Sequence, residues 1–162
     1  MSEYESALSD LCDQIRAEIG VRPFIATDID IPTKSEVDDN DLSEPGMGIL
    51  DQSVEFASVS NAVIFIYSAA GLNAGVGAEA GAILGEFNLR TRSEENKKKP
   101  RLRFRIFHSE DFSSGSIDEI PHSYGIDNLG FSSEEELIGQ IKAYLVTVQR
   151  LRQEKDAFPI FM

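Results

Sequence analysis

Apolar and polar positions along the chain recur with two different periods, and each period predicts one kind of element. Apolar residues spaced three and four apart are typical of amphipathic helices. Helices are accordingly predicted at residues 4–19, 49–58, about 76–87 and 133–151, with a further short one within 116–124. Continuous or strictly alternating apolar runs predict strands at residues 23–31, 62–67, 101–107 and 126–131. Helices and strands therefore follow one another through most of the chain.

This alternation of helices and strands predicts the fold class. The strand at 62–67, AVIFIY, is apolar throughout, which is typical of a parallel strand covered by helices on both faces. We therefore expect an α/β fold, a flavodoxin-like three-layer sandwich whose parallel sheet has about four to five strands. The chain opens with a helix, so the usual first strand is expected to be missing, or to be supplied by the tail or by a neighbouring chain. The length of 162 residues predicts one domain over residues 1–162.

The strand at 101–107 carries arginines in strict alternation with apolar residues. Leu102, Phe104 and Ile106 would line one face, and three arginines would line the other. This pattern predicts either a strand with one wet face or a strand whose arginines meet acidic neighbours.

Three of the predicted helices carry finer expectations. In the second helix, Leu50, Val54 and Ala57 should point inward. The last helix should begin at Ser133, because a capping serine followed by glutamates suits a helix N-terminus. Cys12, in the first helix, is the only cysteine, so it excludes an internal disulfide and is expected to serve as a small apolar contact.

The composition and charge of the chain exclude some classes of binding partner. The chain has 28 acidic and 15 basic residues, a net charge of −13, which argues against nucleic acid because phosphate binding needs a basic face. Such an acidic surface resembles that of proteins from salt-loving archaea, although simple solubility also explains it. No apolar run approaches the roughly 20 residues that cross a bilayer, and the start shows no signal-peptide pattern. We therefore expect a cytoplasmic protein without a membrane partner.

The segment from Asn61 to Phe87 carries the candidate chemistry. It reads as a buried strand, a glycine-rich loop and a helix with Glu79 in its first turn, an arrangement where open α/β proteins build ligand sites. Small residues between Ser68 and Glu79 would let a ligand approach the backbone, and free N–H groups at the helix start favour anions or polar oxygens. A carboxylate there could attack an anomeric carbon or stabilise an oxocarbenium-like charge.

A structural interpretation of the same segment stays open. Glu79 would then stabilise only the helix dipole, and the small residues of the helix would only let it pack close to the sheet. The glycines match neither the phosphate-binding loop nor the dinucleotide fingerprint.

The motif nevertheless resembles a known group. The run AVIFIYS, a short loop and GVGAEAGAIL together resemble the strand-loop-helix signature of the nucleoside 2-deoxyribosyltransferase-like fold and of Toll/interleukin-receptor-like (TIR) nucleotide-binding domains. It is also similar to uncharacterised haloarchaeal proteins of the same layout. The resemblance implies that Glu79 corresponds to the catalytic glutamate, which acts at C1′ of a ribosyl or deoxyribosyl group. Ser68 stands where active deoxyribosyltransferases usually have an aspartate.

These observations define the expected site and function. Catalytic residues would be Glu79 and, as an auxiliary carboxylate, Asp28. Ligand-binding residues would be Ser68, Gly71, Asn73, Gly75, Gly77 and His108. We expect binding of a nucleoside or nucleotide such as NAD, with cleavage or transfer at its N-glycosidic bond. The alternative is a non-catalytic nucleotide-sensing or assembly module.

The histidines, the cysteine and the C-terminal tail bear on cofactors, metals and self-association. No cofactor is expected, and two histidines and one cysteine give no metal-ligand spacing. The apolar tail FPIFM predicts docking on the body of the protein or on a second subunit, which would make the protein a homo-oligomer.

Overall fold

The computed structural model describes residues 3–25, 49–69, 73–90, 103–112, 119 and 124–153. Its elements are, in chain order, α1 (Glu3–Ile19), α3 (Ile49–Val59), β1 (Val63–Tyr67), α4 (Asn73–Arg90), β2 (Phe104–Ser109), β3 (Asn128–Phe131) and α6 (Glu134–Gln153). Each of these elements corresponds to one that the hydrophobic pattern predicts. Residues 26–48, most of the predicted helix at 116–124 and the apolar tail lie outside the described residues.

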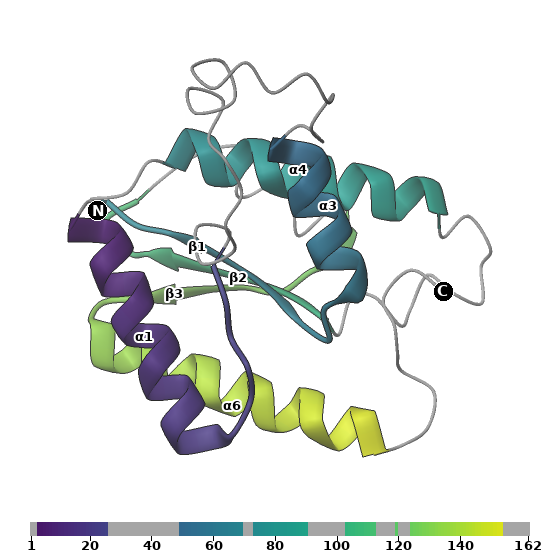
Figure 1. Ribbon diagram of the computed structural model, residues 1–162. Coiled ribbons are helices and arrows are strands. Elements are labelled where there is room, and N and C mark those ends of the chain that lie inside the picture. The colour runs from purple at the N-terminus through teal and green to yellow at the C-terminus, as the bar shows by residue number, and fades with distance from the viewer. Residues whose placement is uncertain are drawn as a thin grey trace, which may run out of the picture.

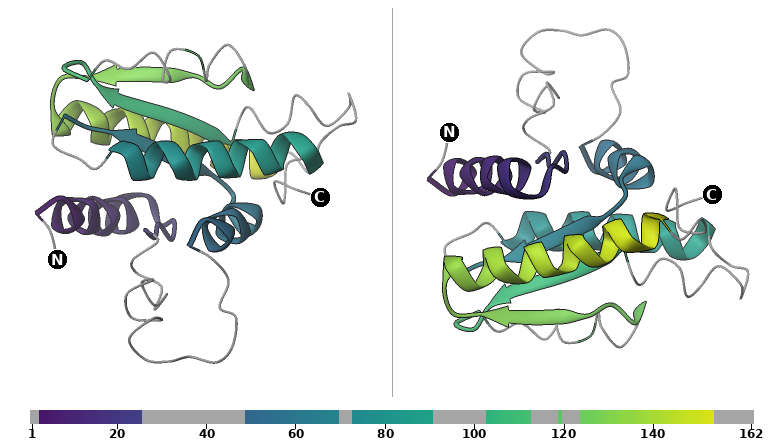
Figure 2. Two further views of the ribbon diagram at one scale, coloured as in Figure 1. Left: turned by 90° about the horizontal axis from the view of Figure 1, so that it is seen from above. Right: turned by 90° about the horizontal axis from the view of Figure 1, so that it is seen from below.

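The three strands form one parallel sheet in the order β1-β2-β3. Figure 1 shows α4 over one face of this sheet and α1 with α6 over the other, and Figure 2 shows the same layers from above and below. The predicted α/β class with a parallel sheet between helices is therefore confirmed. The described part of the chain contains three strands, and the four to five expected strands are not reached within it. Residues 23–25, where another strand was expected to begin, are not in a strand.

One hydrophobic core lies between the sheet and the α3–α4 pair. Its centre is Phe104, which is fully buried. The Phe104 ring stacks on Phe65 at 6.3 Å between centroids and meets Phe87 of α4 edge-on at 5.3 Å. From α3, Val54 and Ala57 join this core, as predicted.

A second core lies between the sheet and the α1–α6 pair. Phe107 of β2 is fully buried there and belongs to the same cluster as Ile15 of α1 and Ile141 of α6. Lys142 of α6 forms an ion pair with Glu18 of α1 at the rim of this cluster. Because β2 is buried on both faces, it is the central strand of the sandwich.

The arginine face of β2 corrects one expectation. The prediction of a solvent-exposed arginine face is wrong, because α6 covers this side of the sheet. Arg103 is only 3% exposed, and the Arg105 guanidinium lies 4.8 Å from the centre of the Tyr144 ring. The other prediction, that the arginines meet acidic neighbours, is confirmed for Arg105, which forms an ion pair with Asp127. Burial lowers the pKa of Arg103 to about 10.

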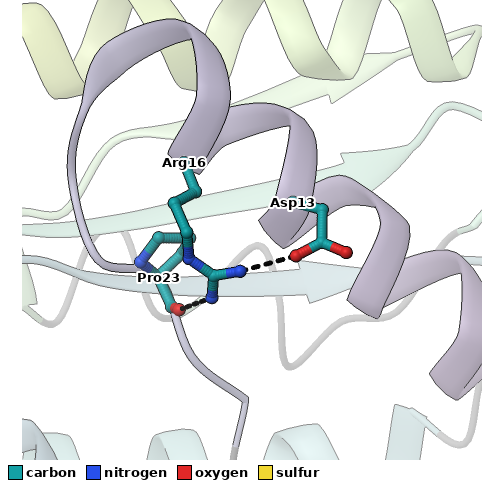
Figure 3. A network of polar contacts seen from close by, with 3 residues as sticks. All are labelled: Asp13, Arg16 and Pro23. Atoms are coloured by element: carbon teal, nitrogen blue, oxygen red, sulfur yellow. Dashed lines mark hydrogen bonds and ion pairs between the residues drawn. The ribbon is translucent and has the colours of Figure 1, made fainter.

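The helix ends show how local sequence sets the boundaries. Gly20 has a φ of 71° and terminates α1 in the left-handed conformation that glycine adopts freely. Arg16 then donates to the Pro23 carbonyl at 3.2 Å and to Asp13 at 2.5 Å, which fixes the direction of the chain after the helix (Figure 3). Cys12 is buried in this helix, as expected of an apolar contact.

The start of α6 confirms the predicted serine cap. The Ser133 hydroxyl accepts the Glu136 backbone N–H at 3.1 Å. The Glu136 carboxylate in turn accepts the backbone N–H of Ser132 at 2.8 Å and its hydroxyl at 2.6 Å. These hydrogen bonds hold the pKa of Glu136 below its ordinary value.

In α3, one predicted inward position is wrong. Leu50 is 44% exposed, whereas Ser53, which the hydrophobic pattern did not select, is 9% exposed and faces α4. The inward stripe of this helix therefore includes a polar side chain.

We predict that Phe104→Ala lowers the free energy of unfolding by about 3–5 kcal/mol, because it leaves a cavity between Phe65 and Phe87. Urea unfolding followed by circular dichroism measures this loss. Val146→Ala, on the 59% exposed side chain of α6, is the control and should change stability by less than about 0.5 kcal/mol. Equal effects of the two substitutions would contradict the assigned core.

Candidate functional site

The carboxyl ends of the strands define one edge of the sheet, which we call the carboxyl edge. Ser68 directly follows β1, His108 lies near the end of β2, and the register pairs His108 with both Tyr67 and Gly130. The helices α4 and α6 both begin at this edge (Figure 1). Open parallel sheets bind ligands outside this edge, and the predicted site residues Ser68 and His108 both lie there.

His108 is held by a neighbouring strand. Its Nδ1 lies 2.6 Å from Oδ1 of Asn128 in β3. Side chains alternate along β2, so His108 is on the same face as Ile106, which packs in the core under α4. Asn128 was not among the predicted site residues, because its role depends on the register between β2 and β3.

An aromatic pair lies beside His108. Tyr67 of β1 stacks on Phe112 at 5.9 Å between ring centroids, with 19° between the ring planes. A turn brings Phe112 there, closed by its N–H donating to the Ser109 carbonyl at 2.9 Å. Burial raises the pKa of Tyr67. No aromatic is present in the glycine-rich loop, so Phe112 is a candidate ligand contact that sequence reasoning missed.

Glu79 has a different position from the expected one. It lies in the second turn of α4, not the first, because the helix begins at Asn73, three residues before the predicted start. Its side chain is half-buried, and its Oε1 accepts a hydrogen bond from Ser53 Oγ of α3 at 3.3 Å. Within the described residues, no basic side chain forms an ion pair with Glu79. The carboxylate is therefore oriented by a hydroxyl.

The early start of α4 also shortens the loop. Asn73 and Gly75 are helical residues, not loop residues, and Gly77 lies in the helix, within its predicted range. A Cβ added at Gly77 or Gly81 would meet nothing within 4 Å. Close packing on the sheet does not explain these two glycines, and it applies instead to Ala80, which is fully buried. The glycines leave an uncovered strip on the outer side of α4.

The structure brings only part of the expected site together. Ser68 and His108 lie at the ends of adjacent strands, and Ser68 is half-buried. Glu79 contacts α3, whereas His108 contacts β3, so the two side chains lie in different surroundings. Asp28 and Gly71 lie outside the described residues.

The charges at the two edges of the sheet differ. Beyond the carboxyl ends of β2 and β3 come acidic side chains, namely Glu110, Asp111 and the three glutamates that open α6. The buried Arg103 and the ion pair of Arg105 with Asp127 lie at the opposite edge. Among the described residues, no group of three or more histidine, cysteine, aspartate or glutamate side chains is placed to hold a metal ion.

The comparison with protein families adds one finding. The chain matches a family model described as "Domain of unknown function (DUF7509)" over residues 1–159. The chain belongs to this family. No curated protein and no solved structure matches it. In the part of the chain that the structure describes, no helix has the length and apolar character needed to cross a membrane.

We predict that Gly81→Ala raises the free energy of unfolding by about 0.5–1 kcal/mol, because alanine favours the helix and its methyl group enters open space. Gly130→Ala is the contrasting substitution, since its methyl group would lie 3.4 Å from His108 Nε2. Urea unfolding of both variants gives the comparison. A loss of stability in Gly81→Ala would show that α4 packs against something at this position.

We also predict that Ser53 and Glu79 are energetically coupled. Ser53→Ala should lower the free energy of unfolding by about 1 kcal/mol. A double-mutant cycle with Glu79→Ala, measured by urea unfolding, should give a coupling energy of about 0.5–1 kcal/mol. Glu79→Gln should keep most of the stability, because its amide oxygen still accepts the hydroxyl. If the losses of stability caused by Ser53→Ala and Glu79→Ala simply add in the double mutant, the hydrogen bond contributes nothing to stability.

Proposed function

We propose that this protein binds a nucleoside or nucleotide, such as NAD, at the carboxyl edge and cleaves its N-glycosidic bond through Glu79. The observation that carries the proposal is the state of the Glu79 carboxylate. It is half-buried in α4, oriented by Ser53, and not paired with a basic side chain within the described residues. A carboxylate without a neighbouring cation keeps its negative charge available for a developing positive charge.

The chemistry would proceed at C1′ of the sugar. As the bond between C1′ and the base nitrogen breaks, its electron pair leaves with the base, and positive charge develops on the sugar. Glu79 would either attack C1′ or stabilise this charge, and water or an acceptor hydroxyl would then complete hydrolysis or transfer. A departing purine or pyrimidine takes up a proton from water, whereas the nicotinamide of NAD leaves as a neutral molecule and needs none.

The remaining predicted residues would line the pocket. Ser68 follows β1, and His108 lies near the end of the adjacent β2. The backbone of Asn73, Gly75 and Gly77 forms the start of α4. Gly71 and the auxiliary carboxylate Asp28 belong to the same proposal.

A second candidate is a nucleotide-binding module without catalysis. The hydrogen bond between Ser53 and Glu79 favours it, because it gives the carboxylate a structural role between α3 and α4. The presence of Ser68, where active deoxyribosyltransferases usually have an aspartate, points in the same direction.

The two candidates are separated by incubating the protein with nucleosides, deoxynucleosides and NAD at low and high salt and measuring free base by chromatography. We predict that the wild type releases base and that Glu79→Gln reduces the rate at least about 100-fold, because the amide cannot act as a nucleophile or carry negative charge. The stability of Glu79→Gln, measured in parallel, shows that the variant is folded.

Glu86→Gln is the matched control. Glu86 lies two turns further along α4, about 10 Å from Glu79 along the helix axis, and its side chain is also half-buried. Its substitution should leave the rate unchanged. If the wild type releases no base but a ligand raises its melting temperature, the protein is a binding module. If the wild type shows neither effect, both candidates are wrong.

A further inference from the structure

The hydrogen bond of His108 determines which ring nitrogen is available. The Asn128 Oδ1 atom can only accept, so Nδ1 of His108, 2.6 Å away, carries the proton. In the neutral ring, Nε2 then holds the lone pair. Within the described residues Nε2 has no hydrogen-bond partner, and the side chain is half-buried. His108 therefore presents an oriented acceptor at the carboxyl edge.

The neighbouring strand places Gly130 beside this acceptor. A Cβ at Gly130 would lie 3.4 Å from Nε2 and 3.6 Å from Cε1 of His108. A Cβ there would make ordinary van der Waals contact with the ring, so Gly130 lies against the edge of the ring that carries Nε2. The same Cβ would lie 3.5 Å from Cγ of Glu110, which puts a carboxylate side chain on the same side of Gly130.

The charge around this edge bears on the type of ligand. The sequence has no lysine or arginine between Lys34 and Arg90, which covers β1 and the first four turns of α4, and none between Arg105 and Lys142, which covers the end of β2, β3 and the start of α6. A phosphate would meet the lone pair of Nε2 and the Glu110 carboxylate without a basic side chain from these segments. A hydroxyl group, in contrast, can donate to Nε2.

We propose that His108 Nε2 accepts a hydrogen bond from a hydroxyl group of an uncharged nucleoside, and that the site binds nucleosides in preference to nucleotides. This inference rests on the proposed function and specifies its substrate class. His108 binds and orients the sugar, and Asn128 positions the ring.

The first test measures the ring itself in the full chain without ligand. Long-range proton–nitrogen NMR spectra of ¹⁵N-labelled protein at pH 8 should show His108 protonated at Nδ1 and not at Nε2. His122→Asn removes the other histidine and assigns the signals. Asn128→Leu should shift His108 towards the Nε2-protonated form. A wild-type ring protonated at Nε2 would overturn the proposal.

The second test measures ligand binding by calorimetry with adenosine and with adenosine monophosphate. We expect adenosine to bind at least about tenfold more tightly than the monophosphate. His108→Asn keeps a side-chain amide able to reach Asn128 but lacks Nε2, and should weaken adenosine binding about five- to tenfold, the value of one hydrogen bond. His122→Asn is the control and should bind adenosine as the wild type does.

The outcomes separate this inference from the proposed function. Adenosine binding that is unchanged in His108→Asn, or tighter binding of the monophosphate, overturns the role of His108 and leaves the proposed function standing. Failure of both ligands to bind, in a panel that includes the other common nucleosides, overturns the proposed function and this inference with it.

Discussion

The burial of β2 on both faces is the constraint on which the rest of this structure depends. Phe104 and Ile106 on one face and Phe107 on the other are all fully buried. A strand of this kind needs helices on both sides, and α4 and α6 supply them. Because the strands are parallel, the same constraint brings their carboxyl ends to one edge. The position of the candidate site is therefore a consequence of how the core is buried.

The site combines a rigid part and a lightly covered part. His108 belongs to the rigid part, because a cross-strand hydrogen bond and the strand pairing hold its ring. The outer side of α4 is lightly covered, because a Cβ at Gly77 or Gly81 would meet open space. Glycine weakens a helix interior, so α4 depends on its buried side for stability. Glu79 is half-buried, between the outer side and the buried side of α4, and a hydrogen bond to Ser53 of α3 orients it.

The sequence was sufficient for those features that depend on local pattern. The continuous apolar run of β1, the helical spacing and the serine cap of α6 all predicted elements that the structure contains. The sequence was insufficient for features that depend on contacts between segments far apart in the chain. The helix α6 covers the face of β2 that carries Arg105, strand register brings Asn128 to His108, and a turn brings Phe112 onto Tyr67. The first turn of α4 was missed because glycines usually indicate a loop, although here they belong to a helix.

The most direct measurement is one that locates where a ligand binds. Backbone amide shifts of ¹⁵N-labelled protein would be followed during titration with adenosine. Binding at the carboxyl edge predicts changes at Ser68 and Ala69, around His108 and Glu110, and in the first turns of α4. Changes confined to the opposite edge, around Arg103 and Asp127, would contradict binding at the carboxyl edge.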